Sequence, residues 1–375
     1  MNSVGTAQKG QHTLRRNSPL LSRTALNLAT LLTLVFLVGA AALPSRAEEP
    51  LKIVTTLTDF ASIARHVGGE AVEVSSLTKG TEDPHFVEAK PSFVKLLAAA
   101  DVVVVAGMEL EIGYLPLLLR NARNSKILPG QAGYVDCSIG IEKLEVPSGP
   151  VDRSMGDVHP YGNPHYWLDP INGIHIADRL AETFSALRPS KREWFQERAD
   201  GFRRTVYTLL AGQELSTRYD VGKLAVLQNR GQLITFLQSQ GDLARLGGWW
   251  GSLLPYAPIK VVDDHNLWTY FARRFGIEVI GHMEPKPGIP PTTAHLQTLV
   301  TAMQAQSVSL ILSSPYYDPR HARFLSQATN ATIVPLAHST GSRPGTDDYI
   351  DMISYNVTAL SRAVQQVQSS PRGGM

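Results

Sequence analysis

The sequence predicts an α/β protein with two Rossmann-like lobes, each built on a central and mostly parallel sheet, joined by a long interlobe helix. Three observations predict this class. Short apolar runs rich in β-branched residues alternate with helical patterns in both halves of the chain. A continuous helical pattern from Asn172 to about Tyr219 separates the halves. The chain that follows an N-terminal segment of 47 residues is 328 residues long, which exceeds the size of one compact core.

These patterns divide the chain into five segments, whose limits are set where one pattern gives way to the next. The predicted segments are a signal peptide at 1–47, an N-terminal α/β lobe at 48–171, the interlobe helix at 172–219, a C-terminal α/β lobe at 220–366 and a loose tail at 367–375.

The first segment has the composition of a secretory signal peptide. Basic residues and no acidic ones precede the apolar run 28–43, and Ser45-Arg46-Ala47 offers small residues for cleavage. The run has 16 residues, fewer than the roughly 20 that a membrane-spanning helix needs. The sequence therefore predicts export of the chain and removal of this segment.

Removal of the segment changes the charge balance. It carries five basic residues, so 30 basic and 33 acidic residues remain, and no basic surplus suggests a nucleic-acid partner. The single cysteine, Cys137, excludes an internal disulfide and a thiolate-rich zinc cluster. Because no cysteine lies at the cleavage site, we expect a periplasmic protein without a lipid anchor. We also expect a monomer.

The first lobe opens with alternating strand and helix patterns. Pro91 suits the first turn of a helix, and Gly68-Gly69 suits a helix end. The run DVVVVAG is typical of a strand buried on both faces of a parallel sheet. The predicted strands are 51–56, 71–77 and 101–107, and the predicted helices are 59–69 and 90–100.

The rest of the chain follows the same rhythm after the interlobe helix. Pro189 lies inside the long helical pattern, where it either kinks the helix or begins a second one. The predicted strands beyond it are 223–228, 259–264, 278–284, 308–314 and 331–337, and the predicted helices are 266–276, 292–306, 319–330 and 347–367.

Four of the eleven histidines share a context that favours metal binding. His85, His265 and His338 follow predicted strands, and His165 precedes the long helix, which gives each lobe two. Any one alone is more often a hydrogen-bonded polar residue at a strand end. Together they suggest a metal site between the lobes, because imidazole suits zinc and ligands of α/β proteins bind beyond the carboxyl ends of strands. The remaining mature histidines fall in helical patterns or elsewhere in loops: His66, His159, His175, His282, His295 and His321.

Enzymatic readings find little support in the sequence. It contains no HExxH, no GxSxG, no P-loop and no GxGxxG after a predicted strand. We therefore expect a binding protein and no enzymatic activity.

Four motifs in order resemble one family. DPHFVEAKPSFVKLLAAADVVVVAGMELE, GNPHYWLDP, VVDDHNLWTYFARRFGIEVIGHMEPKPGIPP and HSTGSRPGTDDYIDMISYNV resemble signatures of the solute receptors that feed zinc and manganese ABC transporters. The similarity runs from about residue 51 to 365, and it is greatest to the zinc-binding members. The resemblance implies a receptor that passes its metal to a membrane permease with a cytoplasmic ATPase.

The resemblance also implies a ligand set. It assigns His85, His165 and His265 to the metal, with His338 at a fourth position where many relatives carry a carboxylate. Asp318 and water are the alternatives for that position. Imidazole ligands favour Zn²⁺ as the transported ion, since manganese prefers oxygen donors. Mn²⁺ or Fe²⁺ in the same role, or a secreted zinc-dependent enzyme, remain the alternative readings.

Overall fold

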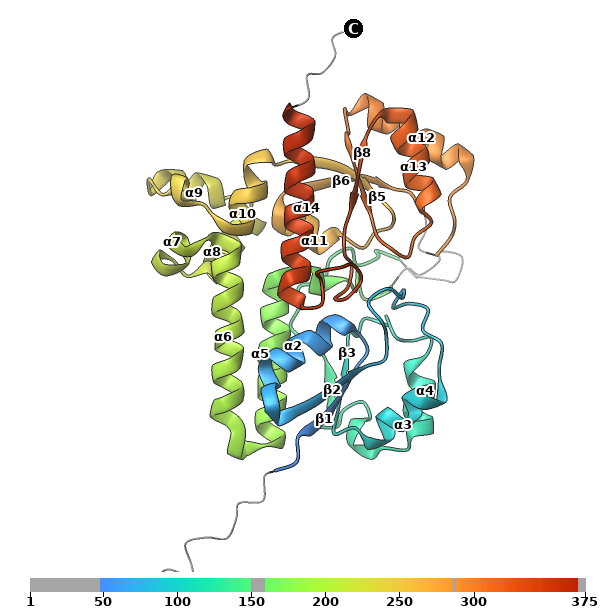
Figure 1. Ribbon diagram of the computed structural model, residues 1–375, viewed down its shortest axis with the longest axis vertical. Helices are drawn as coiled ribbons and strands as arrows, with labels where there is room; N and C mark the ends of the chain where they lie inside the picture. The colour runs from blue at the N-terminus through green and yellow to red at the C-terminus, as the bar shows by residue number, and fades with distance from the viewer. Residues whose placement is uncertain (1–47, 150–158, 286–287, 370–375) are drawn as a thin grey trace, which may run out of the picture. The chain divides into compact units, whose positions relative to one another are not determined.

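The computed structural model describes residues 48–149, 159–285 and 288–369 (Figure 1). The predicted signal peptide and most of the predicted tail lie outside the described residues. Among the described residues, no helix combines the length and the apolar character that crossing a membrane requires.

The N-terminal lobe contains a four-stranded parallel sheet in the order β2-β1-β3-β4. Its last strand was not predicted, because three residues are too short for a recognisable pattern. The strands are β1 (Leu51–Thr55), β2 (Val72–Ser76), β3 (Val102–Val105) and β4 (Tyr134–Asp136), and the helices are α2 (Thr58–Gly68), α3 (Pro91–Ala99) and α4 (Leu115–Ala122).

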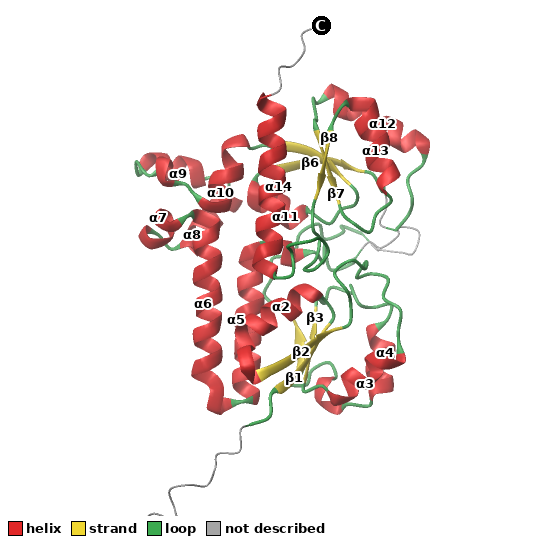
Figure 2. Cartoon of the chain, viewed as in Figure 1, coloured by secondary structure: helices red, strands yellow, loops and turns green. Residues whose placement is uncertain are grey.

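The C-terminal lobe repeats this topology with the strand order β6-β5-β7-β8, again with every pair parallel. Its strands are β5 (Ile259–Asp263), β6 (Ile277–His282), β7 (Leu310–Ser313) and β8 (Thr332–Pro335). The helices α11 (Thr269–Phe275), α12 (Thr293–Ala305), α13 (Pro319–Thr329) and α14 (Tyr349–Ser369) accompany them. The α/β class with two parallel sheets is therefore as predicted, and Figure 2 shows a band of loops between the sheets.

The connection between the lobes is a pair of packed helices. The helical pattern breaks at Pro189, so α5 (Pro170–Leu187) and α6 (Arg192–Ala211) pack against each other instead of forming one helix. Of the two outcomes open for Pro189, a second helix is the one observed. The short helices α7 (Gln213–Arg218), α8 (Val221–Asn229), α9 (Leu233–Ser239) and α10 (Gly248–Leu253) lead from this pair to β5.

The strand predicted at 223–228 is wrong, because these residues lie in α8. The run KLAVLQ is too short for periodicity to separate a strand from a buried helix. Asp220 decides the outcome locally, since its side chain accepts a hydrogen bond from the Lys223 amide and caps the helix.

One apolar cluster passes through both lobes. It includes residues of β1 and β3, of α5 and α6, and of β5 and α14. Two smaller clusters fill the outer layers under α3 and α4 and under α12 and α13. A shared core makes wide separation of the lobes costly, because it would expose apolar surface.

A buried ion pair joins the segment before α5 to α11. The Arg274 guanidinium donates to both carboxylate oxygens of Asp169, over 2.9 and 2.8 Å, and both side chains are almost fully buried. Arg274 also donates to the Ala225 carbonyl and to the Gln228 side chain. Asp169 additionally caps α5 by accepting from the Ile171 amide. The pair therefore fixes the start of the interlobe helices against the C-terminal lobe.

We predict that Arg274→Met destabilises the protein by about 3–5 kcal/mol, because it leaves the Asp169 carboxylate buried without its counter-charge. Urea unfolding followed by circular dichroism measures the loss. The matched control is Arg273→Met, which removes an ion pair with the exposed Glu142 and costs about 1 kcal/mol or less. Equal losses of unfolding free energy in the two variants would show that the buried ion pair matters no more to stability than the exposed one.

Candidate metal centre

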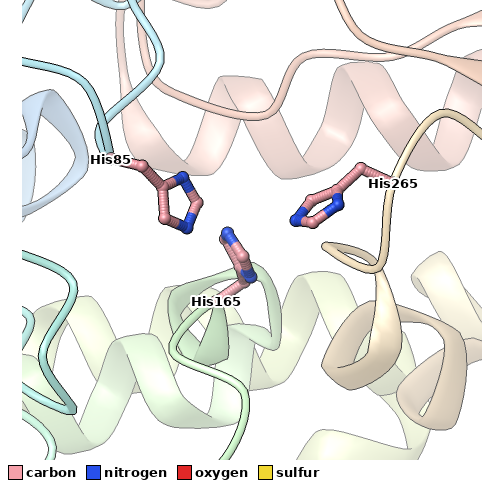
Figure 3. Close-up of side chains that lie close together, drawn as sticks. All are labelled: His85, His165 and His265. Atoms are coloured by element: carbon pink, nitrogen blue, oxygen red, sulfur yellow. The ribbon is translucent and has the colours of Figure 1, made fainter. Parts of the chain in front are cut away.

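Three of the four predicted ligands come together between the lobes. His85 lies in the loop after β2, His165 lies just before α5, and His265 follows β5. Each offers a ring nitrogen, and these three atoms all lie within 4.8 Å of one another. Figure 3 shows the three rings around a common space. No other group of three histidine, cysteine or acidic residues meets this criterion within residues 48–149, 159–285 and 288–369.

His85 and His165 are held by the same local structure. Each follows an Asx-Pro pair, and the side-chain oxygen of Asp83 or Asn163 accepts from the backbone amide of the histidine two residues later, over 3.0 Å in both cases. The same oxygen contacts the Nδ1 atom of that histidine, at 2.7 Å from Asp83 and 2.9 Å from Asn163. One ring nitrogen is thereby occupied and the ring is oriented, as in known metal-binding histidines.

The other ring nitrogens remain available. The Nε2 atoms of His85 and His165 are buried and find no hydrogen-bond partner among the described residues, and a ring nitrogen of His265 faces the same space. A buried polar atom without a partner is costly. A metal ion at this position would satisfy both Nε2 atoms and bind the facing nitrogen of His265, so the arrangement fits a cation.

Burial keeps two of these rings neutral. It lowers the pKa of His265 to about 3, and neighbouring His85 acts in the same direction. Burial likewise lowers the pKa of His165 well below its usual value, with His85 and His265 adding to the effect. A neutral imidazole has the free lone pair that a metal needs. In contrast, although burial raises the pKa of Asp83, its hydrogen bond with His85 holds that pKa below the ordinary value.

The fourth predicted ligand, His338, lies outside the group of three. It follows β8. The Asn356 side chain holds the preceding residue, because it accepts from the Ala337 amide and donates to the Ala337 carbonyl, each over 2.7 Å. The His338 ring packs edge-on to Tyr316, with 4.2 Å between ring centroids. Neither ring nitrogen makes a well-formed hydrogen bond within the described ranges, although the Glu82 backbone opposes the burial that lowers its pKa to about 3.

The alternative fourth ligand, Asp318, is occupied elsewhere. Its carboxylate caps α13 through the Arg320 amide and forms an ion pair with the Arg320 side chain. Hydrogen bonds from Arg320 hold the pKa of Asp318 below its usual range. This local pairing holds the carboxylate at the helix start, and Asp318 is not a member of the group of three.

The carboxylates near the predicted ligands differ in role, which the sequence does not reveal. Asp83 orients His85, whereas Asp169 pairs with Arg274. Asp263 contacts the His282 ring at 2.6 Å, and Asp264 accepts from the Ser314 amide. Asn163, which orients His165, was not anticipated. The repeated Asx-Pro-His pattern is the sequence signal that could have identified it.

Sequence reasoning also missed His159, which was assigned only to a loop. Its ring lies 5.3 Å from the His85 ring between centroids, close to the 5.2 Å between His85 and His165. The helical histidines behave differently: His66 pairs with Asp348 and His295 contacts the His282 carbonyl. His159 is therefore the additional imidazole at the centre.

Comparisons with known proteins identify the family. The family model described as "Zinc-uptake complex component A periplasmic" matches residues 53–213 and 238–363. A manganese ABC transporter substrate-binding lipoprotein of Streptococcus mitis is 22% identical, covering 84% of this chain and 90% of that protein. An iron ABC transporter substrate-binding lipoprotein of Streptococcus pyogenes serotype M1 is 24% identical, covering 91% and 98%.

Solved structures share the fold. The crystal structure of ZnuA has a TM-score of 0.60 and 19% identity, covering 84% of this chain and 99% of that chain. A manganese-bound periplasmic metal-binding protein of candidatus Liberibacter asiaticus has a TM-score of 0.59 and 16% identity, covering 84% and 100%.

The comparisons correct one prediction. We expected a periplasmic protein without a lipid anchor. The names of the curated relatives contradict this expectation, because they are called lipoproteins. That expectation was based on the segment 1–47, which lies outside the described residues, and on the location of the only cysteine. Cys137 is buried just after β4.

The family model spans well over half of the chain, and solved structures share its two-lobed fold. The chain belongs to the ZnuA family, and it is a metal-binding substrate-binding protein of an ABC transporter and not an enzyme.

Proposed function

We propose that the protein captures Zn²⁺ between its lobes through His85, His165 and His265 and delivers the ion to the permease of an ABC importer. The observation that carries this proposal is the convergence of three available imidazole nitrogens from both lobes within 4.8 Å. Two nitrogens bound to one zinc lie at most about 4.2 Å apart, since each bond is about 2.0–2.1 Å. Small rotations of the rings therefore complete the site.

The donor set supports zinc as the ion. All three converging atoms are imidazole nitrogens, which suit zinc, whereas manganese prefers a larger number of oxygen donors. The second candidate is the same role for Mn²⁺ or Fe²⁺, because relatives 21–24% identical are named for manganese and iron. The choice depends on the donors that complete the site, and His338 remains the fourth ligand that the sequence predicts.

The partners follow from the transport role. The relatives are named as substrate-binding components of ABC transporters, and such a component requires a permease with a cytoplasmic ATPase. We propose that the protein acts as a monomer that presents its ion to this permease. The shared apolar core favours release through small movements of the site loops over wide opening of the lobes.

We predict that Zn²⁺ stabilises the protein by about 4 kcal/mol when free zinc exceeds the dissociation constant a thousandfold. Differential scanning fluorimetry at neutral pH measures the shift in melting temperature. His85→Ala should abolish most of the shift, because it removes a ligand, while His175→Ala is the matched control at an exposed helical position. An unchanged melting temperature of the wild type with zinc would refute metal binding here.

We predict that zinc displaces manganese from the purified protein. Competition dialysis against equal concentrations of Zn²⁺, Mn²⁺ and Fe²⁺, followed by elemental analysis, should return zinc as the dominant metal, because nitrogen donors favour it. Dominant manganese or iron would overturn the zinc assignment and leave the receptor role in place.

We predict a weak pH dependence of metal binding above pH 5. His165 and His265 have lowered pKa values, with about 3 for His265, so neither must lose a proton to bind a metal at pH 5–7. Calorimetry in buffers of different ionisation enthalpy should detect release of about one proton or fewer at pH 5.5, where three ordinary imidazoles would release more than two. Release of two or more would contradict the lowered values.

The sign of the accompanying stability change follows from the same groups. Below pH 6.5 the unfolded chain protonates both imidazoles, whereas the folded chain keeps His265 neutral down to about pH 3 and holds the pKa of His165 well below its usual value. Their contribution to stability is therefore complete above pH 6.5 and is lost as the pH falls toward 3.

A further inference from the structure

His159 has the same hydrogen-bonding pattern as two of the proposed ligands, His85 and His165. The Met108 backbone forms a hydrogen bond with its ring, and its Nε2 atom is buried without a partner in the described part of the chain. His85 and His165 show this arrangement too, with one ring nitrogen bonded and Nε2 left without a partner. The Glu82 backbone also contacts the His338 ring, but His338 differs in that both of its ring nitrogens are buried without a well-formed hydrogen bond to the described residues.

The position of His159 is fixed by the turn that also carries His165. The Gly162 amide donates to the His159 carbonyl over 3.2 Å, and the Asn163 amide donates to the Leu144 carbonyl over 2.9 Å. Gly162 has φ +101°, and an added Cβ would lie 2.6 Å from the Leu144 carbonyl oxygen, so only glycine fits. A single rigid turn therefore sets both His159 and the His165 segment.

The Met108 backbone that contacts His159 is itself held in an unusual conformation. Met108 and Glu109 both have positive φ angles, 52° and 66°, although neither is glycine. Such strain persists where the surrounding structure imposes it and is concentrated at functional sites. The Glu111 carboxylate helps to impose it by accepting from the amides of Ala106 and Gly107. The backbone partner of His159 is thus a built feature of the N-terminal lobe.

We propose that His159 is the fourth protein ligand of the metal ion bound by His85, His165 and His265. This inference rests on the proposed function of the site. The His159 ring lies against the His85 ring at about the separation found between His85 and His165. Its nitrogen lies outside the group of three, so it joins the ion by a rotation of its side chain. Four imidazoles fill a tetrahedral zinc site and exclude water from the ion.

The experiment compares ligand number and affinity in four variants of the full chain: His159→Ala, His338→Ala, His85→Ala and the control His175→Ala. Co²⁺ is the spectroscopic probe, because its visible absorption is strong in tetrahedral sites and weak in sites of higher coordination. X-ray absorption of the zinc form counts the imidazoles. Competition with a chromophoric chelator gives the affinity, and thermal unfolding confirms that each variant folds. His159→Gln serves as a second variant, since it keeps the volume of the side chain.

We expect His159→Ala and His159→Gln to bind one zinc ion with an affinity at least about 100-fold weaker than that of the wild type. Removal of a residue that only supports a ligand weakens affinity by about 10- to 100-fold. The imidazole count should fall from four to three, which a purely structural role would not produce. His338→Ala and His175→Ala should keep the wild-type spectrum.

A wild-type spectrum and affinity in both His159 variants would overturn this inference, and a changed spectrum in His338→Ala would transfer the fourth position to that residue. Both of these outcomes leave the proposed function intact. Unaltered binding by His85→Ala would instead refute the proposed function itself.

Discussion

The buried ion pair between Asp169 and Arg274 is the contact on which the geometry of the centre depends. Asp169 lies four residues after His165, and Arg274 lies in the helix that begins four residues after His265. The pair therefore fixes a ligand-bearing segment of one lobe against a ligand-bearing segment of the other. A buried ion pair adds little net stability over an apolar replacement, but breaking it is costly. Its value here lies in the register it imposes: the two histidine segments cannot slide past each other without exposing a charge to the apolar core.

Within that frame, the centre keeps its imidazoles neutral and aimed. Burial disfavours the charged form of His165 and His265, and the crowding of several imidazoles adds to this effect. In the Asx-Pro-His segments the Asx side chain contacts the Nδ1 atoms of His85 and His165. These contacts orient the rings so that the Nε2 atoms face the common space. The protein thus tolerates buried atoms without hydrogen bonds, which is unfavourable, and a bound cation relieves that cost. Stability and metal affinity are linked through the same few atoms.

The sequence predicts the fold class well because the long apolar strands and the amphipathic helices carry strong periodicity. It fails at KLAVLQ and at β4, where the segments are too short for a period to show. His85 and His265 were singled out because parallel strands bring their carboxyl ends to one edge, and His165 because a family motif surrounds it. His159 was missed because its place depends on Gly162, on the Met108 backbone and on a turn, none of which has a sequence period. Likewise, the partner of Asp169 lies 105 residues away in the chain, and no local pattern indicates it.

The choice between zinc and manganese follows from the state of the nearby oxygen atoms more than from the count of histidines. Manganese would need carboxylate oxygens, and the acidic side chains next to the predicted ligands in the sequence, like the alternative ligand Asp318, already have other hydrogen bonds. Asp83 bonds His85, Asp264 accepts from the Ser314 amide, and Asp318 pairs with Arg320. Recruiting any of them would break an existing contact, whereas the imidazole nitrogens are free at no such cost. Relatives are named for manganese and for iron, and we propose that the donors that complete the site, and not the sheets, select the ion.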